Sequence, residues 1–146
     1  MRIVLSISLL FFSFFSFAQF SLIDWGVATS GYYEPRTKNI VVDNQNNILS
    51  LGIFSGTIDL DPGNGTFTIT NNIGNGSYLQ MLDSNGIFLW GKYLGAIYAR
   101  AIDLDGQGNI YITGNFGGTQ DFDPGTAVYN LTANSATADV FIVKLD

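Results

Sequence analysis

The chain repeats a block of its own sequence. Residues 52–63 return as residues 114–125 at a shift of 62 positions (114 minus 52), without a gap, and both blocks end in Asp-x-Asp-Pro-Gly. Weaker matches extend on both sides, and the shift changes only in the intervening loops. Self-similarity of this kind is typical of repeat architectures, in which one supersecondary unit stacks on copies of itself. It predicts a fold class more strongly than it predicts a function.

The first 18 residues have the pattern of a secretory signal peptide. Arg2 supplies a positive start, residues 3–17 are apolar except for scattered serines, and Ala18 ends a small-residue cleavage site. A retained membrane anchor is the alternative, but this apolar stretch is shorter than the roughly 20 residues that a helix needs to span a bilayer. We expect residues 1–18 to be removed, no membrane span to remain, and the chain to be secreted or displayed on the cell surface.

Composition excludes several kinds of chemistry. The chain has no Cys and no His, which removes disulfides, a thiol nucleophile, the commonest zinc ligands and the commonest general base. The formal net charge is −6, and the basic residues that follow the signal are dispersed. Because binding to nucleic-acid phosphates needs clustered Lys and Arg, we expect no nucleic-acid partner.

Turn-forming residues divide the rest of the chain into short runs rich in Ile, Val, Phe, Tyr and Leu. This spacing predicts many short antiparallel strands, and no helical periodicity competes with it. We expect an all-β fold with two repeat units, residues 19–83 and residues 84–146, each of four strands. In the first unit the expected strands are 22–25, 39–42, 47–54 and 77–82. In the second unit they are 87–93, 99–104, 109–116 and 140–145.

Alternation within these strands predicts burial. The even-numbered residues of 110–116 are Ile, Ile, Gly and Phe, which share one face of the strand. The run 140–145 is largely apolar on both faces, which indicates burial on both. The stretch 117–139 is a long excursion with two further short strands, 119–122 and 128–132. Gly56 and Gly118 match across the units and predict a bulge or tight bend before the following Thr.

Several segments of the second unit carry a resemblance to a known family. They are residues 82–92, 101–103, 108–114, 116–119 and 140–146. Their order resembles the bacterial β-propeller repeat abbreviated SBBP, and the inserted Asp-Phe-Asp-Pro-Gly is similar to repeats in secreted proteins of Bacteroidetes-type bacteria. The resemblance covers nearly all of the chain after the signal and is weaker for the first unit. It implies antiparallel four-stranded blades and no general catalytic activity.

The chain holds fewer units than such a resemblance implies. β-Propellers typically have four to eight blades, whereas about two are present here. Two blades cover only their inner pair of faces and leave apolar outer faces of a kind that soluble monomers rarely expose. We expect a fragment of a longer protein, in preference to a truncated reading frame or a protomer that stacks on others. Further blades are then needed to cover the open faces.

The paired aspartates are the best site candidates in the sequence. Asp59 and Asp61 of the first unit correspond to Asp121 and Asp123 of the second. Carboxylates at i and i+2 of a strand point to one face, and with turn carbonyls they can supply several of the oxygen ligands that calcium takes. The alternative is a type II turn with Pro at i+1 and Gly at i+2, in which the preceding Asp bonds the turn backbone. We favour the turn alone, and calcium is the candidate cofactor.

Three other patterns are weaker. Residues 103–109 echo the start of an EF-hand loop, but a hairpin turn explains them better. Two carboxylates beside one turn do not form the facing pair that a glycosidase needs, so we expect no catalytic site. Trp25 and Trp90 are of a type that stacks on sugars, but packing between blades explains them better.

These observations predict a non-enzymatic segment of a secreted or cell-surface β-propeller, acting as a scaffold or as a binding surface for a protein or a glycan. One alternative is a calcium-binding adhesion or matrix module. Another is the non-catalytic propeller part of a larger secreted enzyme.

Overall fold

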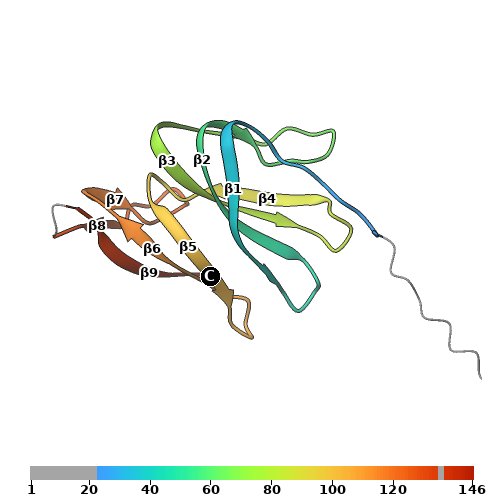
Figure 1. The fold of residues 1–146 in the computed structure, drawn as a ribbon. Coiled ribbons are helices and arrows are strands. Elements are labelled where there is room, and N and C mark those ends of the chain that lie inside the picture. Colours follow the sequence, from blue (N-terminus) through green and yellow to red (C-terminus); the bar gives the residue numbers. More distant parts are fainter. Residues whose placement is uncertain (1–22, 135–136) are drawn as a thin grey trace, which may run out of the picture.

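The computed structural model describes residues 23–134 and 137–146, and this part of the chain is all-β, with antiparallel sheets and no helices (Figure 1). The all-β prediction is therefore confirmed. The predicted signal peptide, residues 1–18, lies outside the described residues. A search of the described residues for a helix long and apolar enough to cross a membrane found none.

The first sheet contains four strands that follow one another along the chain. Their order in the sheet is also their order in sequence, so each strand pairs with its neighbour. Tight turns join the first strand to the second and the third to the fourth, whereas a longer loop, residues 60–67, joins the second to the third. The strands are β1 (Ser30–Val42), β2 (Ile48–Asp59), β3 (Thr68–Leu82) and β4 (Phe88–Tyr93).

The second sheet contains three strands, in the order β5-β6-β9. They are β5 (Tyr98–Leu104), β6 (Ile110–Phe116) and β9 (Asp139–Leu145). The excursion between β6 and β9 forms a separate two-stranded hairpin of β7 (Thr119–Asp121) and β8 (Asn130–Thr132). The two short strands predicted within residues 117–139 are therefore present, each shorter than expected.

Two predicted strands are placed differently. Residues 23–25, which are the described part of the predicted strand 22–25, form no strand. The strand predicted to open the second unit is β4, and it pairs with β3 in the first sheet. The outer edge of β3 has backbone groups that need partners, and the tight turn after Asp83 returns the chain along that edge at little entropic cost. The second sheet consequently has one strand fewer than predicted.

The strands β2 and β3 are longer than the predicted strands 47–54 and 77–82, because in the first unit the excursion joins the same sheet. Gly56 has a φ of 73°, and the pairing of β2 with β3 shifts in register between Phe54 and Gly56. Gly118, at the equivalent place in the second unit, has a φ of 64°. This left-handed backbone favours glycine, which lets the chain bend. The bend predicted at both glycines is confirmed.

Aspartate side chains cap three hairpin turns. In the β1–β2 turn, Asp43 Oδ1 accepts hydrogen bonds from the backbone N–H groups of Gln45 and Asn47, both at 2.8 Å. Asp105 makes the same pair of bonds in the β5–β6 turn, and Asp83 makes them in the β3–β4 turn. The side chain in each case satisfies N–H groups that the tight turn leaves without a ladder partner.

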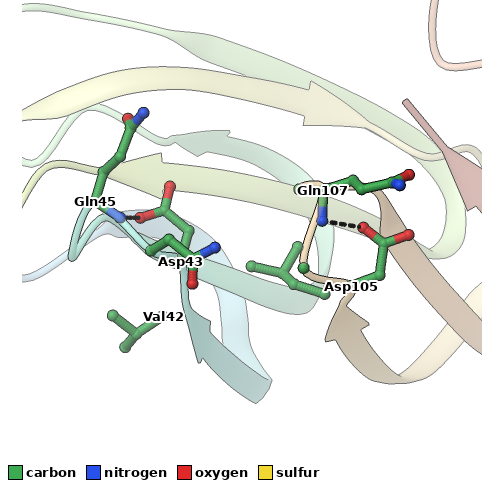
Figure 2. A pocket seen from close by; sticks show the side chains of 9 residues that line it. Val42, Asp43, Gln45, Asp105 and Gln107 are labelled. Atoms are coloured by element: carbon green, nitrogen blue, oxygen red, sulfur yellow. Dashed lines mark hydrogen bonds between the residues drawn. The ribbon is translucent and has the colours of Figure 1, made fainter.

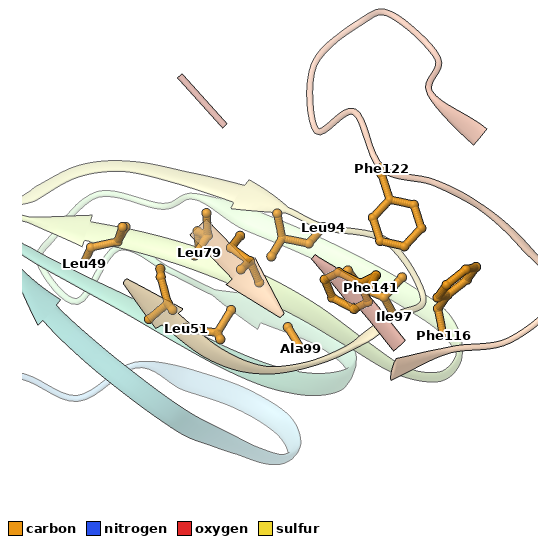
Figure 3. Close-up of a cluster of buried hydrophobic side chains, with 11 residues drawn as sticks. Leu49, Leu51, Leu79, Leu94, Ile97, Ala99, Phe116, Phe122 and Phe141 are labelled. Carbon is orange, nitrogen blue, oxygen red and sulfur yellow. The ribbon is translucent and has the colours of Figure 1, made fainter. Parts of the chain in front are cut away.

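The two sheets pack face to face around one hydrophobic core (Figure 3). The first sheet contributes fully buried leucines from β2 and β3, and the second contributes Ile102, Ile112, Phe116 and Phe141. The predicted alternation in β6 is confirmed, since Ile112 is only 1% exposed and Phe116 only 6%. The leucines are Leu49, Leu51 and Leu79.

The prediction that residues 140–145 are buried on both faces is wrong. Phe141 is buried, but Val140 is 70% exposed and Ile142 is 78% exposed. The part of the second sheet's outer face around Val140 and Ile142 is left largely exposed by the described residues. The strands that are buried on both faces are β2 and the second half of β3, because the second sheet covers one side and a second cluster, built around Phe54 and Tyr78, covers the other.

Ser77 of β3 connects the first sheet to the chain that enters the second. Its fully buried Oγ donates to the Ile97 carbonyl at 2.8 Å and accepts from the Ala99 N–H at 3.0 Å. Its backbone N–H donates to the Gly95 carbonyl, and its carbonyl accepts from the Leu94 N–H. The connection between β4 and β5 is therefore held by hydrogen bonds as well as by apolar packing.

The β5–β6 turn depends on a left-handed residue, Gly108, whose φ is 87°. An alanine there adds a Cβ in a conformation that costs an L-residue about 1–2 kcal/mol. We expect Gly108→Ala to lower the free energy of unfolding by about that amount in a denaturant titration. Gly106→Ala is the matched control and should lose none, because Gly106 lies in the same turn with equally open space around an added Cβ but without a positive φ. Equal losses in both variants would contradict this account of the turn.

Candidate functional site

The two Asp-x-Asp-Pro-Gly loops make the same hydrogen bonds. Asp59 Oδ1 accepts from the N–H groups of Asp61 (3.0 Å) and Phe67 (2.8 Å), and Asp61 Oδ1 accepts from the Gly63 N–H (2.8 Å). In the second unit Asp121 Oδ1 accepts from the N–H groups of Asp123 (3.0 Å) and Tyr129 (2.8 Å), and Asp123 Oδ1 accepts from the Gly125 N–H (2.6 Å). One oxygen of each predicted site residue is thus occupied by the backbone of its own loop.

Each loop places one apolar side chain in the interior. Leu60 is fully buried and packs with Phe54 and Tyr78. Phe122, its equivalent, packs against Phe116 and Phe141, with ring centroids at 5.1 and 4.9 Å. The aspartates that flank each apolar residue hold the loop in the shape that directs this side chain inward. The position between the two aspartates is therefore an anchor for the loop.

The predicted type II turn is wrong in its backbone geometry. Neither Gly63 nor Gly125 has a positive φ, which a type II turn requires at this position. The turn is closed instead by the Asp side chain that precedes Pro, because this carboxylate accepts from the glycine N–H two residues later. The part of the prediction that assigned the aspartate to the turn backbone is confirmed.

The described residues offer no group of three or more acidic side chains that could hold a metal ion. The pKa of Asp121 lies below its usual value because its carboxylate accepts the backbone N–H of Asp123 and that of Tyr129, while desolvation opposes the shift. The N–H donors keep the carboxylate ionised but occupy one of its oxygens, so only the other oxygen is open to bind a cation. The geometry thus favours the structural role of the aspartates, and calcium stays a hypothesis for experiment.

Asp59→Ala and Asp59→Asn together distinguish a structural aspartate from a calcium ligand. The alanine removes an acceptor for two N–H groups, so we expect the free energy of unfolding to fall by about 1–2 kcal/mol. Asparagine keeps an Oδ1 acceptor and should restore most of that loss, whereas a calcium site would not tolerate it. Asp24→Ala, which removes an exposed carboxylate, is the control for charge.

The measurement is thermal melting of each variant in calcium and in chelator. We expect the wild-type melting temperature to be the same in both. A calcium-dependent melting temperature that Asp59→Asn abolishes would instead establish the metal site.

The EF-hand echo at residues 103–109 is a hairpin turn in the structure. Asp105 and its counterpart Asp43 lie in neighbouring turns that line a hollow of about 330 Å³ (Figure 2). The pKa of Asp105 is lowered to about 2, chiefly because Asn109 Nδ2 donates to its carboxylate, with further donation from the Asn109 and Gln107 N–H groups and from the Tyr111 hydroxyl. The carboxylates are directed at their own turns rather than at a shared ion.

Asp105 makes the stability of the chain sensitive to acid. Its folded pKa of about 2 lies below its ordinary value of 3.8, so its contribution is fully present above pH 3.8 and is lost as the pH falls toward 2. We expect wild type and Asp105→Ala to differ in melting temperature at neutral pH and to converge in that acidic window. Melting scans from neutral pH to pH 2 test this, and a gap that stays constant would contradict the assignment.

The outer face of the second sheet carries aromatic and basic side chains that the site predictions did not include. The Lys38 Nζ lies 5.3 Å and the Arg100 guanidinium 4.7 Å from the Tyr98 ring centroid, and the Lys144 Nζ lies 5.7 Å from that of Tyr111. Three of the few basic residues of an acidic chain thus gather on or beside this face. Alternation along residues 98–104 could not have identified this face, because the pairing of β5 with β6 shifts in register between Ala99 and Ala101 and leaves Ala99 and Ile102, three positions apart, both buried.

This face is also hollowed. A shallow, mostly apolar depression of about 400 Å³ lies among Ala101, Tyr111, Thr113 and Ile142. The tryptophans that were considered as sugar platforms lie elsewhere. Trp90 packs against the shared core, and Trp25, 38% exposed, donates its indole N–H to the Ser84 carbonyl at 2.9 Å. An apolar and aromatic surface of this kind suits contact with another protein layer.

Comparison of the chain with models of protein families, with curated proteins and with solved structures found no match.

Proposed function

We propose that this chain is a non-enzymatic segment of a secreted or cell-surface β-propeller repeat protein, in which it serves as a scaffold and binding surface. The observation that carries the proposal is that two faces of the sheets carry corresponding residues of the two units. One is the face of the first sheet that is buried against the second sheet. The other is the outer face of the second sheet.

The correspondence follows from the sequence shifts. At the shift of 62, Leu49 and Leu51 correspond to Tyr111 and Thr113, and at the shift of 63, Leu79 corresponds to Ile142. The leucines are fully buried between the sheets, whereas Ile142 is 78% exposed. A third sheet stacked on the second in the same way would cover this face. Such repeated stacking of sheets is the packing of propeller blades.

The non-enzymatic part of the proposal rests on how the carboxylates are used. The four paired aspartates accept hydrogen bonds from their own loop backbones, and the turn aspartates do the same. These carboxylates stabilise the loops that contain them, which is the role expected of residues that recur in every unit. The exposed Tyr98, Tyr111 and Ile142 are then the residues that we assign to contact with a neighbouring blade or with a partner protein.

Extending the chain tests the proposal directly. A further copy of residues 84–146, joined after Asp146, should stack on the outer face around Ile142 and bury it. We expect one cooperative melting transition, with a melting temperature about 5 °C or more above that of the original chain, because neighbouring units of a repeat array stabilise one another.

The control is the same extended chain with Phe116→Ser in the added copy, which removes the aromatic group that packs beneath the neighbouring sheet. The gain in melting temperature should then be lost. An extended chain that melts in two independent transitions, with the original one unchanged, would refute stacking of this kind.

A further inference from the structure

The outer edge of β9 has no strand partner among the described residues, although its counterpart in the first sheet has one. At the shift of 63, β9 corresponds to the second half of β3, residues 76–82, and this part of β3 pairs with β4. In the second sheet β9 is the edge strand. A strand edge with free N–H and C=O groups is a template for pairing with another chain.

In the first sheet, the loop that follows β2 forms a seat for β4. A Cβ added at Gly91 of β4 would lie 2.8 Å from Leu60 Cδ1 and 3.0 Å from the Phe67 ring. The Phe67 ring also packs against that of Phe88, with centroids 5.2 Å apart. The seat therefore accepts an apolar residue at the first position of β4 and requires glycine at the fourth.

The second sheet has the same seat without a strand in it. Phe122 and Tyr129 correspond to Leu60 and Phe67 at the shift of 62. Together with residues 142–146, and with Lys92 of β4 from the first sheet, they line a hollow of about 570 Å³ beside β9. Tyr129 is 65% exposed, whereas Phe67, which β4 covers in part, is 37% exposed. Of the two residues that would hold a fourth strand, Tyr129 is thus largely exposed, whereas Phe122 is already buried in the core.

The chain itself carries a second segment of the β4 type. At a shift of 65, residues 23–28 correspond to β4: Ile23 corresponds to Phe88, Trp25 to Trp90 and Gly26 to Gly91. All six residues are exposed and form no strand, with Ile23 89% exposed. No atom lies within 4 Å of a Cβ built at Gly26, so packing within its own chain does not require glycine at this position. A strand in the seat does require glycine there, as β4 does at Gly91.

We propose that β9 of one copy of this chain binds residues 23–28 of a second copy as the fourth strand of its sheet. The pairing of β4 with β3 sets the register, which places Gly26 opposite Val143 and Trp25 opposite Lys144. Trp25 then lies on the same face as the exposed Ile142 and covers part of it. Within one chain this docking is not available, since Trp25 lies on the β3–β4 turn and the blue start of the chain runs away from β9 in Figure 1.

The predicted assembly is head-to-tail. Each copy donates one segment and receives another, so the contact generates a ring or an open series of copies rather than a symmetric dimer. When residues 23–28 dock on another copy, the hydrogen bond from Trp25 to Ser84 is lost. Strand pairing with β9 and burial of Ile23 against Tyr129 replace it. The proposal does not depend on the β-propeller assignment, because the seat and the segment belong to this chain.

Gly26→Val is the test. A Cβ at this position has no atom of its own chain within 4 Å but would collide with Phe122 and Tyr129 in the seat, as a Cβ at Gly91 collides with their counterparts. In sedimentation velocity and sedimentation equilibrium over a range of concentrations, we expect the purified chain to form a series of oligomers. Gly26→Val should weaken the association by about tenfold or more, with the melting temperature of the single chain unchanged.

Gly106→Val is the matched control, since an added Cβ there also has open space, and it should associate as wild type does. A synthetic peptide with the sequence of residues 87–94 should occupy the seat and reduce the oligomers to single chains. The proposal is overturned if wild type stays monomeric or if Gly26→Val associates normally. Peptide binding by a wild-type chain that remains monomeric would also overturn it, because the seat would then belong to a strand from another source.

Discussion

Face-to-face burial of the first sheet on the second is the constraint on which the rest of the structure depends. Leu49, Leu51 and Leu79 have no access to water, and the inner face of the second sheet, which includes Phe141 of β9, covers them. Burial of apolar surface contributes about 25 cal/mol per Å², so this contact is a large favourable contribution to folding. Ser77 adds hydrogen bonds that fix how the chain enters the second sheet. Sheets of this kind are stable only in contact with each other.

The aspartates of the turns and of the Asp-x-Asp-Pro-Gly loops share one role, which is to satisfy backbone N–H groups where strands end. Asp43, Asp83 and Asp105 cap hairpin turns, and Asp59 and Asp121 close the loops that carry Leu60 and Phe122 into the interior. The acidity of the protein is thus largely a consequence of its many turns. This use of carboxylates explains why paired aspartates that resemble half a metal site recur in both units without converging on one point.

Several features were predictable from local pattern alone. The spacing of turn residues predicted antiparallel strands, the alternation in 110–116 predicted the buried side chains of β6, and Gly56 and Gly118 predicted bends. The type II turn at Gly63 was predicted wrongly, because an Asp side chain competes with the backbone bond that defines that turn. Whether residues 140–145 are covered on one face or on two depends on whether another layer of the protein packs there. The alternation of residues along a strand does not show whether such a layer is present.

The sequence by itself determined the all-β class, the approximate positions of most strands and the use of aspartates in the turns, since these follow from interactions between residues close along the chain. Only the tertiary structure decided that β4 completes the first sheet, that the aspartates face their own loops, and that the edge of β9 and the face around Ile142 stay uncovered. The reason is physical. A strand carries the same residues whether or not another strand lies beside it, so partners and coverage are properties of the packed chain.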